Sequence, residues 1–453
     1  MEREVGLQVS GSAVKNDRSG LDFIPLLWYN TRNFMKRFSA SLVFLLLASG
    51  AWAQGLEDWY AALGEIAGID SHAGKAAFWT LVIPPGGMYQ SMGTAYSAVL
   101  KDSGYLEANP AGSALLKDTE ISIYHNDWIG ESRLEAGIFT IRNGDLGIGL
   151  GAKLLYLPFT AINTWGERYR NPWSTETAKG YYTEFVGTAN LAYNLLHTFY
   201  FSGLTVGGSL KFANRGVPES IALGQSASAL IFDLGAITKI NFLKFYYSRE
   251  NNLAFALTMK NLGLPVGGDP LPTSMVVGFA YNPIKPMTFS FDTTVPFYLS
   301  TPLSLDFSGA EGVSQAIGFN WALLETLGVQ AGLNLKAGLP RLSAGVTLLI
   351  DSLTMNLNYT VDLMTSLTPF DRVSIEIKMN LGDLGRQDRE TAAREFYLAG
   401  IEYYAKGNLE EAIVQWEKAL AVLPNFLPAL EMTRTASKAV ELQNQMEAAQ
   451  KLQ

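Results

Sequence analysis

The sequence predicts an all-β transmembrane barrel of about fourteen antiparallel strands, with a plug before it and a small α-helical domain after it. Residues 353–363, LTMNLNYTVDL, alternate apolar and polar side chains over a length that suits a strand tilted across a membrane. The same alternation recurs from 119 to 381, and the connections between these segments are mostly short and long in alternation. That order is typical of an outer-membrane barrel with short periplasmic turns and long extracellular loops.

The composition agrees with this fold class and excludes several kinds of site. Charged residues make up only 17% of the chain, while aromatic residues make up 12% and glycine occurs 43 times. The 34 Lys and Arg are outnumbered by 42 Asp and Glu, so nothing indicates a nucleic-acid partner. Because the chain has no cysteine, disulfides, thiolate metal sites and a lipidated N-terminal cysteine are excluded.

An export signal is predicted near the start of the chain. Lys36 and Arg37 precede a short apolar run, and Ala51-Trp52-Ala53 has the form of a cleavage site, which makes 35–53 a signal peptide. The alternative is a membrane anchor, but the run is too short for a spanning helix. Residues 1–34 are interpreted as upstream sequence from a misplaced start codon. With no other apolar run of helical length, a membrane would be crossed by strands.

Fourteen segments show the strand pattern or its glycine-rich version. They cover 119–128, 132–142, 145–156, 181–195, 199–213, 226–239, 251–261, 272–281, 285–295, 312–321, 325–337, 340–350, 352–363 and 370–381. In the last two segments, Asn356, Asn358 and Glu376 are placed inside the barrel and Leu357 outside.

The connections favour a barrel over the alternative, a soluble all-β protein. Even-numbered strands are mostly followed by tight turns and odd-numbered strands by long loops, as at 157–180 and 296–311. Two connections depart from the rule, because the first odd gap is short and 240–250 is long for a turn. A soluble sandwich has no need of such alternation.

Glycines line one face of the third predicted strand. Leu146, Ile148 and Leu150 would face lipid, which puts Gly147, Gly149 and Gly151 toward the lumen. Glycine inside a strand often marks a kink or the close approach of another backbone. Two interpretations remain open: tight packing of a plug against this wall, or a bend or opening in it that serves as a lateral gate.

Residues 54–117 are predicted to form a periplasmic hatch that plugs the barrel of 118–382. The segments 56–69 and 74–83 have helical spacing or short apolar runs. Residues 84–116 are rich in Gly, Ala and Ser and lack a strand period. Such a composition suits a compact segment packed inside something else.

After the barrel the apolar period becomes helical, which predicts a periplasmic domain over 383–453. Residues 391–424 carry a tetratricopeptide pattern of two helices, and 427–449 form a third, amphipathic helix. Asn408 and Glu411 have the spacing of a capping box. The predicted packing residues are Gly400, Tyr403, Ala412, Trp416, Ala419 and Pro424. A single repeat is short for this architecture, so it would lean on the barrel or pair with a periplasmic protein partner.

The stretch around Asn109-Pro110-Ala111-Gly112 resembles a known family. After Gly86-Gly87 and Met92–Tyr96, and just before the first strand, it looks like the hatch of FadL-type long-chain fatty-acid transporters and of related PorV-type barrels. The added repeat is similar to that of FadL-like spirochaete proteins. The resemblance, over about 84–381, implies fourteen strands, hydrophobic substrates captured outside, and delivery through a gap near a kinked third strand.

The leading functional hypothesis is passive outer-membrane transport of hydrophobic small molecules, such as long-chain fatty acids or related lipids. Expected ligands are a fatty acid, lipid or detergent in the barrel and outer-membrane lipid around it. The alternatives are an envelope adaptor that docks periplasmic partners through the repeat, and a general porin. We expect no enzyme activity, cofactor or metal, because His72, His125 and His197 stand in no catalytic or metal-binding motif.

Overall fold

A computed structural model describes residues 75–451 apart from gaps at 130–131, 161–178, 199–200, 219–223, 249, 301–303, 308–309, 337–338 and 363–371. The predicted upstream sequence, signal peptide and first part of the hatch, with His72, lie outside the described residues.

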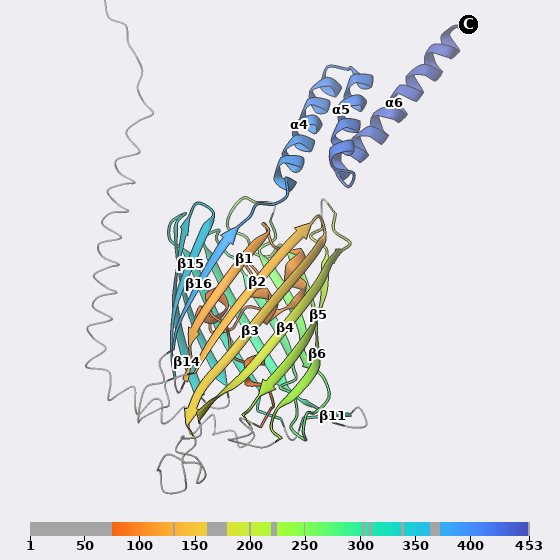
Figure 1. Cartoon of the computed structure of the whole chain (residues 1–453). Coiled ribbons are helices and arrows are strands. Elements are labelled where there is room, and N and C mark those ends of the chain that lie inside the picture. Colours follow the sequence, from red (N-terminus) through yellow and green to blue (C-terminus); the bar gives the residue numbers. More distant parts are fainter. Residues whose placement is uncertain are drawn as a thin grey trace, which may run out of the picture. The chain divides into compact units, whose positions relative to one another are not determined.

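Fourteen of the described strands close into one antiparallel barrel (Figure 1). Neighbours in sequence pair with one another, and β1 pairs with β16 to close the ring. The barrel strands are β1 (Glu120–Asp127), β2 (Arg133–Asn143), β3 (Leu146–Thr160), β4 (Lys179–Leu195), β5 (Leu204–Gly216), β6 (Ala227–Ile240), β7 (Leu253–Leu262), β8 (Ser274–Tyr281), β9 (Met287–Pro296), β12 (Ser314–Ala322), β13 (Leu327–Lys336), β14 (Leu339–Ile350), β15 (Leu353–Asp362) and β16 (Arg372–Asn380).

Each of the fourteen predicted strands overlaps one barrel strand, so the predicted closed antiparallel barrel is confirmed. Two details differ from the prediction. The expected loop at 296–311 contains a separate hairpin, β10 (Tyr298–Ser300) with β11 (Ser304–Asp306). The connection from β13 to β14 is a further exception to the long-loop rule, because Lys336 and Leu339 already pair with each other.

The alternation of side chains places polar groups inside and apolar groups outside, as predicted. In β15, Leu357 and Tyr359 are exposed on the outer face, whereas Asn356 and Asn358 are buried inside. Large apolar side chains are exposed along the outer faces of many other strands. Such a surface suits a surrounding of lipid rather than water.

Residues 75–118, which we call the lumenal segment, lie inside the barrel (Figure 1). Ala77 N donates to Pro270 O (2.8 Å) in the β7–β8 connection. Thr119 N donates to Gly382 O (2.7 Å), just after β16. These contacts lie at opposite ends of the barrel, so the segment runs along its length. Its short helices are η1 (Trp79–Leu81), α2 (Gly87–Ser91), α3 (Tyr105–Ala108) and η2 (Pro110–Ala114).

Three helices follow the barrel: α4 (Arg386–Ala405), α5 (Leu409–Val422) and α6 (Leu427–Lys451). The predicted helices therefore exist, and they share an apolar core around Trp416. The capping-box expectation is wrong, because the Asn408 side chain makes no cap hydrogen bond and only its backbone carbonyl accepts from Ala412 N (3.1 Å). Among the described residues, no helix has both the length and the apolar character needed to cross a membrane.

Candidate functional site

Asn109 ties the lumenal segment to itself and to the barrel wall. The residue is fully buried, and its Oδ1 accepts from Ala111 N (3.0 Å), which caps η2. Its Nδ2 donates to Ser97 O (3.1 Å) within the segment and to Ala236 O (3.3 Å) in β6. One side chain therefore fixes the start of η2 and links it to a strand.

The three glycines of β3 face the lumen, as predicted, and the lumenal segment packs directly on them. A β-carbon at any of these positions would overlap an atom of the segment, so no larger side chain fits without movement. The contacts are Gly147 with the Ser113–Ala114 peptide, Gly149 with the Tyr105 hydroxyl and Gly151 with the Leu106 side chain. The geometry is that of the close-packing interpretation.

The glycine contact extends beyond β3 to strands that the sequence argument did not connect with it. Gly207 in β5 lies against Pro110, whose carbonyl also accepts from Asn190 Nδ2 (2.9 Å). Gly235 in β6 lies against Asn109. The predicted motif and the predicted glycines thus belong to one interface, on the β3–β6 side of the barrel.

The pairing of the third strand shows no irregularity at the position of the expected kink. β3 pairs with β2 and β4 without a register shift through Gly147, Gly149 and Gly151. A shift occurs instead between β6 and β7, next to Asp233, where Asn261 has a left-handed backbone (φ +56°). The wall at the glycines is therefore closed in this structure, and a gate there stays a prediction about another conformation.

Acidic side chains of the barrel hold the backbone of the lumenal segment. Asp292 in β9 accepts from Tyr96 N (3.0 Å), Ser97 N (2.9 Å) and Ser97 Oγ (2.8 Å). Glu184 in β4 accepts from Thr80 N (2.8 Å) and Thr80 Oγ1 (2.5 Å). Charge-assisted bonds of this kind are stronger than bonds between neutral groups.

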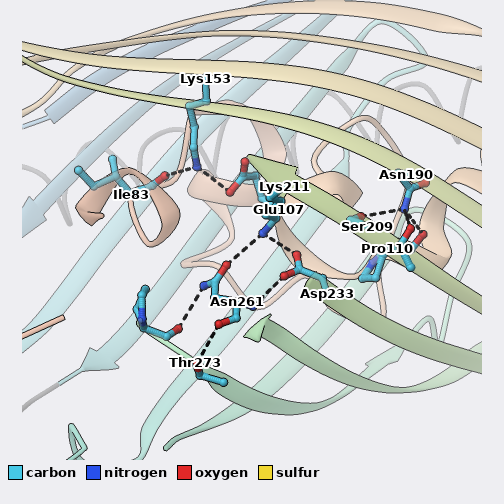
Figure 2. A network of polar contacts seen from close by, with 12 residues as sticks. Ile83, Glu107, Pro110, Lys153, Asn190, Ser209, Lys211, Asp233, Asn261 and Thr273 are labelled. Atoms are coloured by element: carbon cyan, nitrogen blue, oxygen red, sulfur yellow. Dashed lines mark hydrogen bonds and ion pairs between the residues drawn. The ribbon is translucent and has the colours of Figure 1, made fainter. Parts of the chain in front are cut away.

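Two lysines belong to a further polar network, which Figure 2 shows from close by. Lys153 in β3 donates to Glu107 Oε2 (2.8 Å) of α3 and to Ile83 O (3.2 Å). Lys211 in β5 contacts Asp233 Oδ2 (2.5 Å) and donates to Asn261 Oδ1 (3.1 Å). Burial alone would raise the pKa of Glu107, but the neighbouring lysines hold this pKa below its usual value.

On the outer face, the wall over this network is hollowed. Gly137, Ala152 and Gly187 are direct neighbours across β2, β3 and β4, and they point outward. Ile123 and Phe212 flank this row on β1 and β5. Small residues between large ones leave an apolar groove of about 600 Å³. Its lining shares Ile138, Gly151, Ala152 and Thr188 with a small cavity on the lumenal side.

Sequence reasoning missed the charged members of this site, although a signal was present. Lys153, Lys211, Asp233 and Asp292 each occupy an inward position of an otherwise alternating strand. A buried charge requires a partner. Lys153 and Asp292 find theirs in the lumenal segment, whereas Lys211 and Asp233 pair with each other across the barrel wall. The sequence does not say which residues of 75–118 provide the partners.

The predicted packing residues of the helical domain, apart from Pro424, come together in a separate cluster. Trp416, Ala412 and Ala419 are fully buried, and Trp416 Nε1 donates to Tyr397 O (3.1 Å). Gly400 lies against the Trp416 ring, which leaves no room for a β-carbon there. Tyr403 is half-buried at this core, whereas Pro424 is exposed just after α5.

Two proteins of known structure are similar to this chain at low identity. The Pseudomonas putida toluene transporter TodX is 12% identical, covers 65% of this chain and 96% of its own, and gives a TM-score of 0.43. A Pseudomonas aeruginosa FadL homologue is 10% identical, covers 65% of this chain and 97% of its own, and also gives 0.43.

Sequence relatives occur in Treponema pallidum (strain Nichols). One UPF0164 protein is 27% identical over 424 residues, which are 90% of this chain and 94% of that protein. Another is 25% identical over 398 residues, which are 81% of this chain and 76% of that protein. A family model described as Uncharacterised protein family (UPF0164) matches residues 60–384. Because this match covers most of the chain, the protein belongs to the UPF0164 family.

Proposed function

We propose that the protein is a passive outer-membrane transporter of hydrophobic small molecules, with long-chain fatty acids or related lipids as the substrate class. The observation that carries the proposal is the thin wall at Gly151 and Ala152. An apolar groove lies outside it, and a cavity beside the lumenal segment lies inside it. An apolar molecule in the groove would be separated from the lumen by little more than backbone.

The lumenal segment acts in this proposal as the hatch. Its hydrogen bonds to Asp292, Glu184, Asn190 and Lys153 attach it to several strands, so it blocks straight passage along the barrel. Substrate would then cross the wall near Gly147, Gly149 and Gly151 after a local movement of hatch and strand. Backbone groups freed by that movement need partners in lipid, and polar atoms of the hatch are close enough to supply them.

The proposed orientation follows from the barrel ends. The end at which β16 leads into α4 faces the periplasm, and the end that carries the long β3–β4 connection faces outward. The helical domain, as a single tetratricopeptide-like unit, is then periplasmic.

Cysteine cross-links test the lateral route, because the chain has no cysteine of its own. Gly137 and Ala152 are paired on the outer face, so Gly137→Cys with Ala152→Cys can bridge β2 and β3. The matched control is Ala331→Cys with Ala344→Cys, an outward-facing pair on β13 and β14.

Uptake of a fluorescent fatty acid by cells that express each variant is the measurement. Oxidation should stop uptake in the β2–β3 variant and leave the control unaffected, and reduction should restore it. Unchanged uptake after complete cross-linking contradicts the lateral route. An absence of uptake by the unmodified protein, relative to cells that lack it, contradicts transport itself.

A second function, docking of a periplasmic protein, is favoured by α6. Leu442 and Met446 are each more than 60% exposed on this helix, outside the core around Trp416. Removal of 442–451 should abolish site-specific photo-cross-linking of a partner from the exposed position 438, one turn earlier on α6, without changing fatty-acid uptake. The double variant Leu442→Ser with Met446→Ser removes the exposed apolar side chains of α6. If it gives the same cross-linked products as the unmodified protein, docking at this helix is contradicted.

A further inference from the structure

Lys153 holds two separate parts of the lumenal segment at once. Its ammonium donates to the Glu107 carboxylate on α3 and to the carbonyl of Ile83, which follows η1 (Figure 2). The Lys153 side chain is 5% exposed and that of Glu107 is 15% exposed. This ion pair is therefore the point at which α3, the η1 region and β3 meet.

The surroundings of the ion pair combine charge with aliphatic surface. The adjoining cavity is about 10 Å³, which is room for about one water molecule. Its lining contains Leu81, Leu106, Ala136, Ile138, Val186, the two lysines and Glu107. The Lys153 ammonium and the apolar wall beside it match the two chemical parts of an amphipathic acid, its carboxylate and its chain.

The outer groove reaches the same place from the other side. Gly151 and Ala152 line both the groove and the cavity, and Lys153 follows them directly in β3. A chain lying in the groove would thus have its polar end within a residue or two of Lys153 once the wall or α3 moved. The groove is apolar, so it offers no countercharge of its own.

Lys153 depends on Glu107 for its countercharge. Lys211, the other lysine at the cavity, is satisfied separately by Asp233 and Asn261. Removal of one member of a buried ion pair is strongly unfavourable because the other charge remains buried. Another carboxylate in the same place removes that penalty, and Glu107 lies on a four-residue helix rather than on a strand.

We propose that Glu107 occupies the site of the substrate's own carboxylate, and that an incoming long-chain monocarboxylate displaces Glu107 from Lys153 and so releases α3 from the wall. The inference rests on the proposed transport function and narrows its substrate class. Amphipathic acids open the hatch by exchange of one carboxylate for another. Uncharged hydrocarbons and esters of the same length lack the group that makes the exchange.

Binding to the purified full-length protein tests the exchange. The probes are parinaric acid, whose polyene chain is fluorescent, and its uncharged methyl ester. The unmodified protein should bind the acid more tightly than the ester. Glu107→Gln removes the internal competitor and should bind the acid about tenfold more tightly, with ester affinity unchanged. Lys153→Met should abolish the preference for the acid and retain ester binding.

The control variant is Glu135→Gln, which removes a carboxylate that pairs with His125 on the outer face, outside the cavity. Its affinities for acid and ester should equal those of the unmodified protein. Hydrogen exchange gives a second readout that does not depend on a variant. Amides of α3 should exchange faster when the acid is added and stay unchanged with the ester.

The possible failures are distinguishable. Equal binding of acid and ester by the unmodified protein, unchanged acid affinity in Glu107→Gln, or equal exchange of α3 with either probe overturns the carboxylate exchange and leaves transport standing. If neither probe binds, both the exchange and the proposed function are overturned.

Discussion

The hydroxyl of Tyr105 occupies the space that a β-carbon on residue 149 would need. The same hydroxyl is hydrogen-bonded to Thr140 Oγ1 (3.0 Å) in β2. Glycine at 149 is thus required by a single atom of the lumenal segment, since the next atom of the Tyr105 ring lies 3.3 Å from the same point.

Gly149→Ala should therefore loosen the lumenal segment, at a cost of about 1–3 kcal/mol typical of an overpacked core. Removal of the hydroxyl in Gly149→Ala with Tyr105→Phe should restore most of that loss. Hydrogen exchange of residues 105–114 measures the seating, and heat-modifiable gel mobility checks that the barrel is folded. Failure of Tyr105→Phe to rescue would show that another contact fixes glycine at this position.

Leu357 and its neighbours in β15 test the membrane-facing side. Leu357→Arg places a charge on the outer face and should cost about 2–4 kcal/mol if it lies near the middle of the bilayer. Asn358 is tightly packed inside, so the fair control is Thr354→Arg, on the lumenal side of the same strand and beside a large vestibule. Urea unfolding in lipid vesicles gives both values. Equal costs would contradict the assignment of the outer face to lipid.

The sequence determines strands and faces well because the alternation repeats locally. Leu357, Asn358 and the β3 glycines lie on the faces that period two assigns to them. The residues that pack on those glycines could not be predicted. The contact between Tyr105 and Gly149 joins segments that are distant in the sequence, and it leaves no periodic pattern in either of them. The register shift between β6 and β7 at Asp233 was not predicted either, because a shift by a single residue barely changes the apolar pattern of the sequence.

Trp416 should be the main packing residue of the helical domain. Its ring is fully buried and lies against Gly400 and Tyr404, so Trp416→Ala should cost about 3–5 kcal/mol and unfold α4 and α5. The barrel closes its own hydrogen bonds and should still form. Circular dichroism measures the helices, and heat-modifiable gel mobility measures the folded barrel. The control is Val414→Ala, at an exposed position of α5, which should change neither. Loss of barrel insertion in Trp416→Ala would show that the two parts do not fold independently.

The proposed orientation is open to antibody labelling of intact cells. A tag inserted within 161–178, between β3 and β4, should be accessible from outside, because an even number of strands returns the chain to its starting side. A tag after Lys451 should become accessible only after the outer membrane is permeabilised. Surface labelling of the C-terminal tag would invert the topology.

Substitutions of Asn109 can separate the capping of η2 from the attachment to the barrel wall. The side-chain oxygen caps η2, whereas the side-chain nitrogen donates to Ser97 O and to Ala236 O in β6. Asn109→Asp keeps an oxygen that accepts from Ala111 N but loses the Nδ2 donor to Ser97 O and Ala236 O. Asn109→Ala loses both functions. Both variants leave Ser97 O and Ala236 O without a donor, at about 1–3 kcal/mol for each buried acceptor, and Asp adds a buried carboxylate oxygen that faces them. Asn109→Asp should therefore loosen the segment from β6 at least as much as Asn109→Ala. Fatty-acid uptake should change in both variants, with the barrel intact by gel mobility. If Asn109→Asp behaves like the unmodified protein, only the cap matters, and the bond to Ala236 plays no part in seating the hatch.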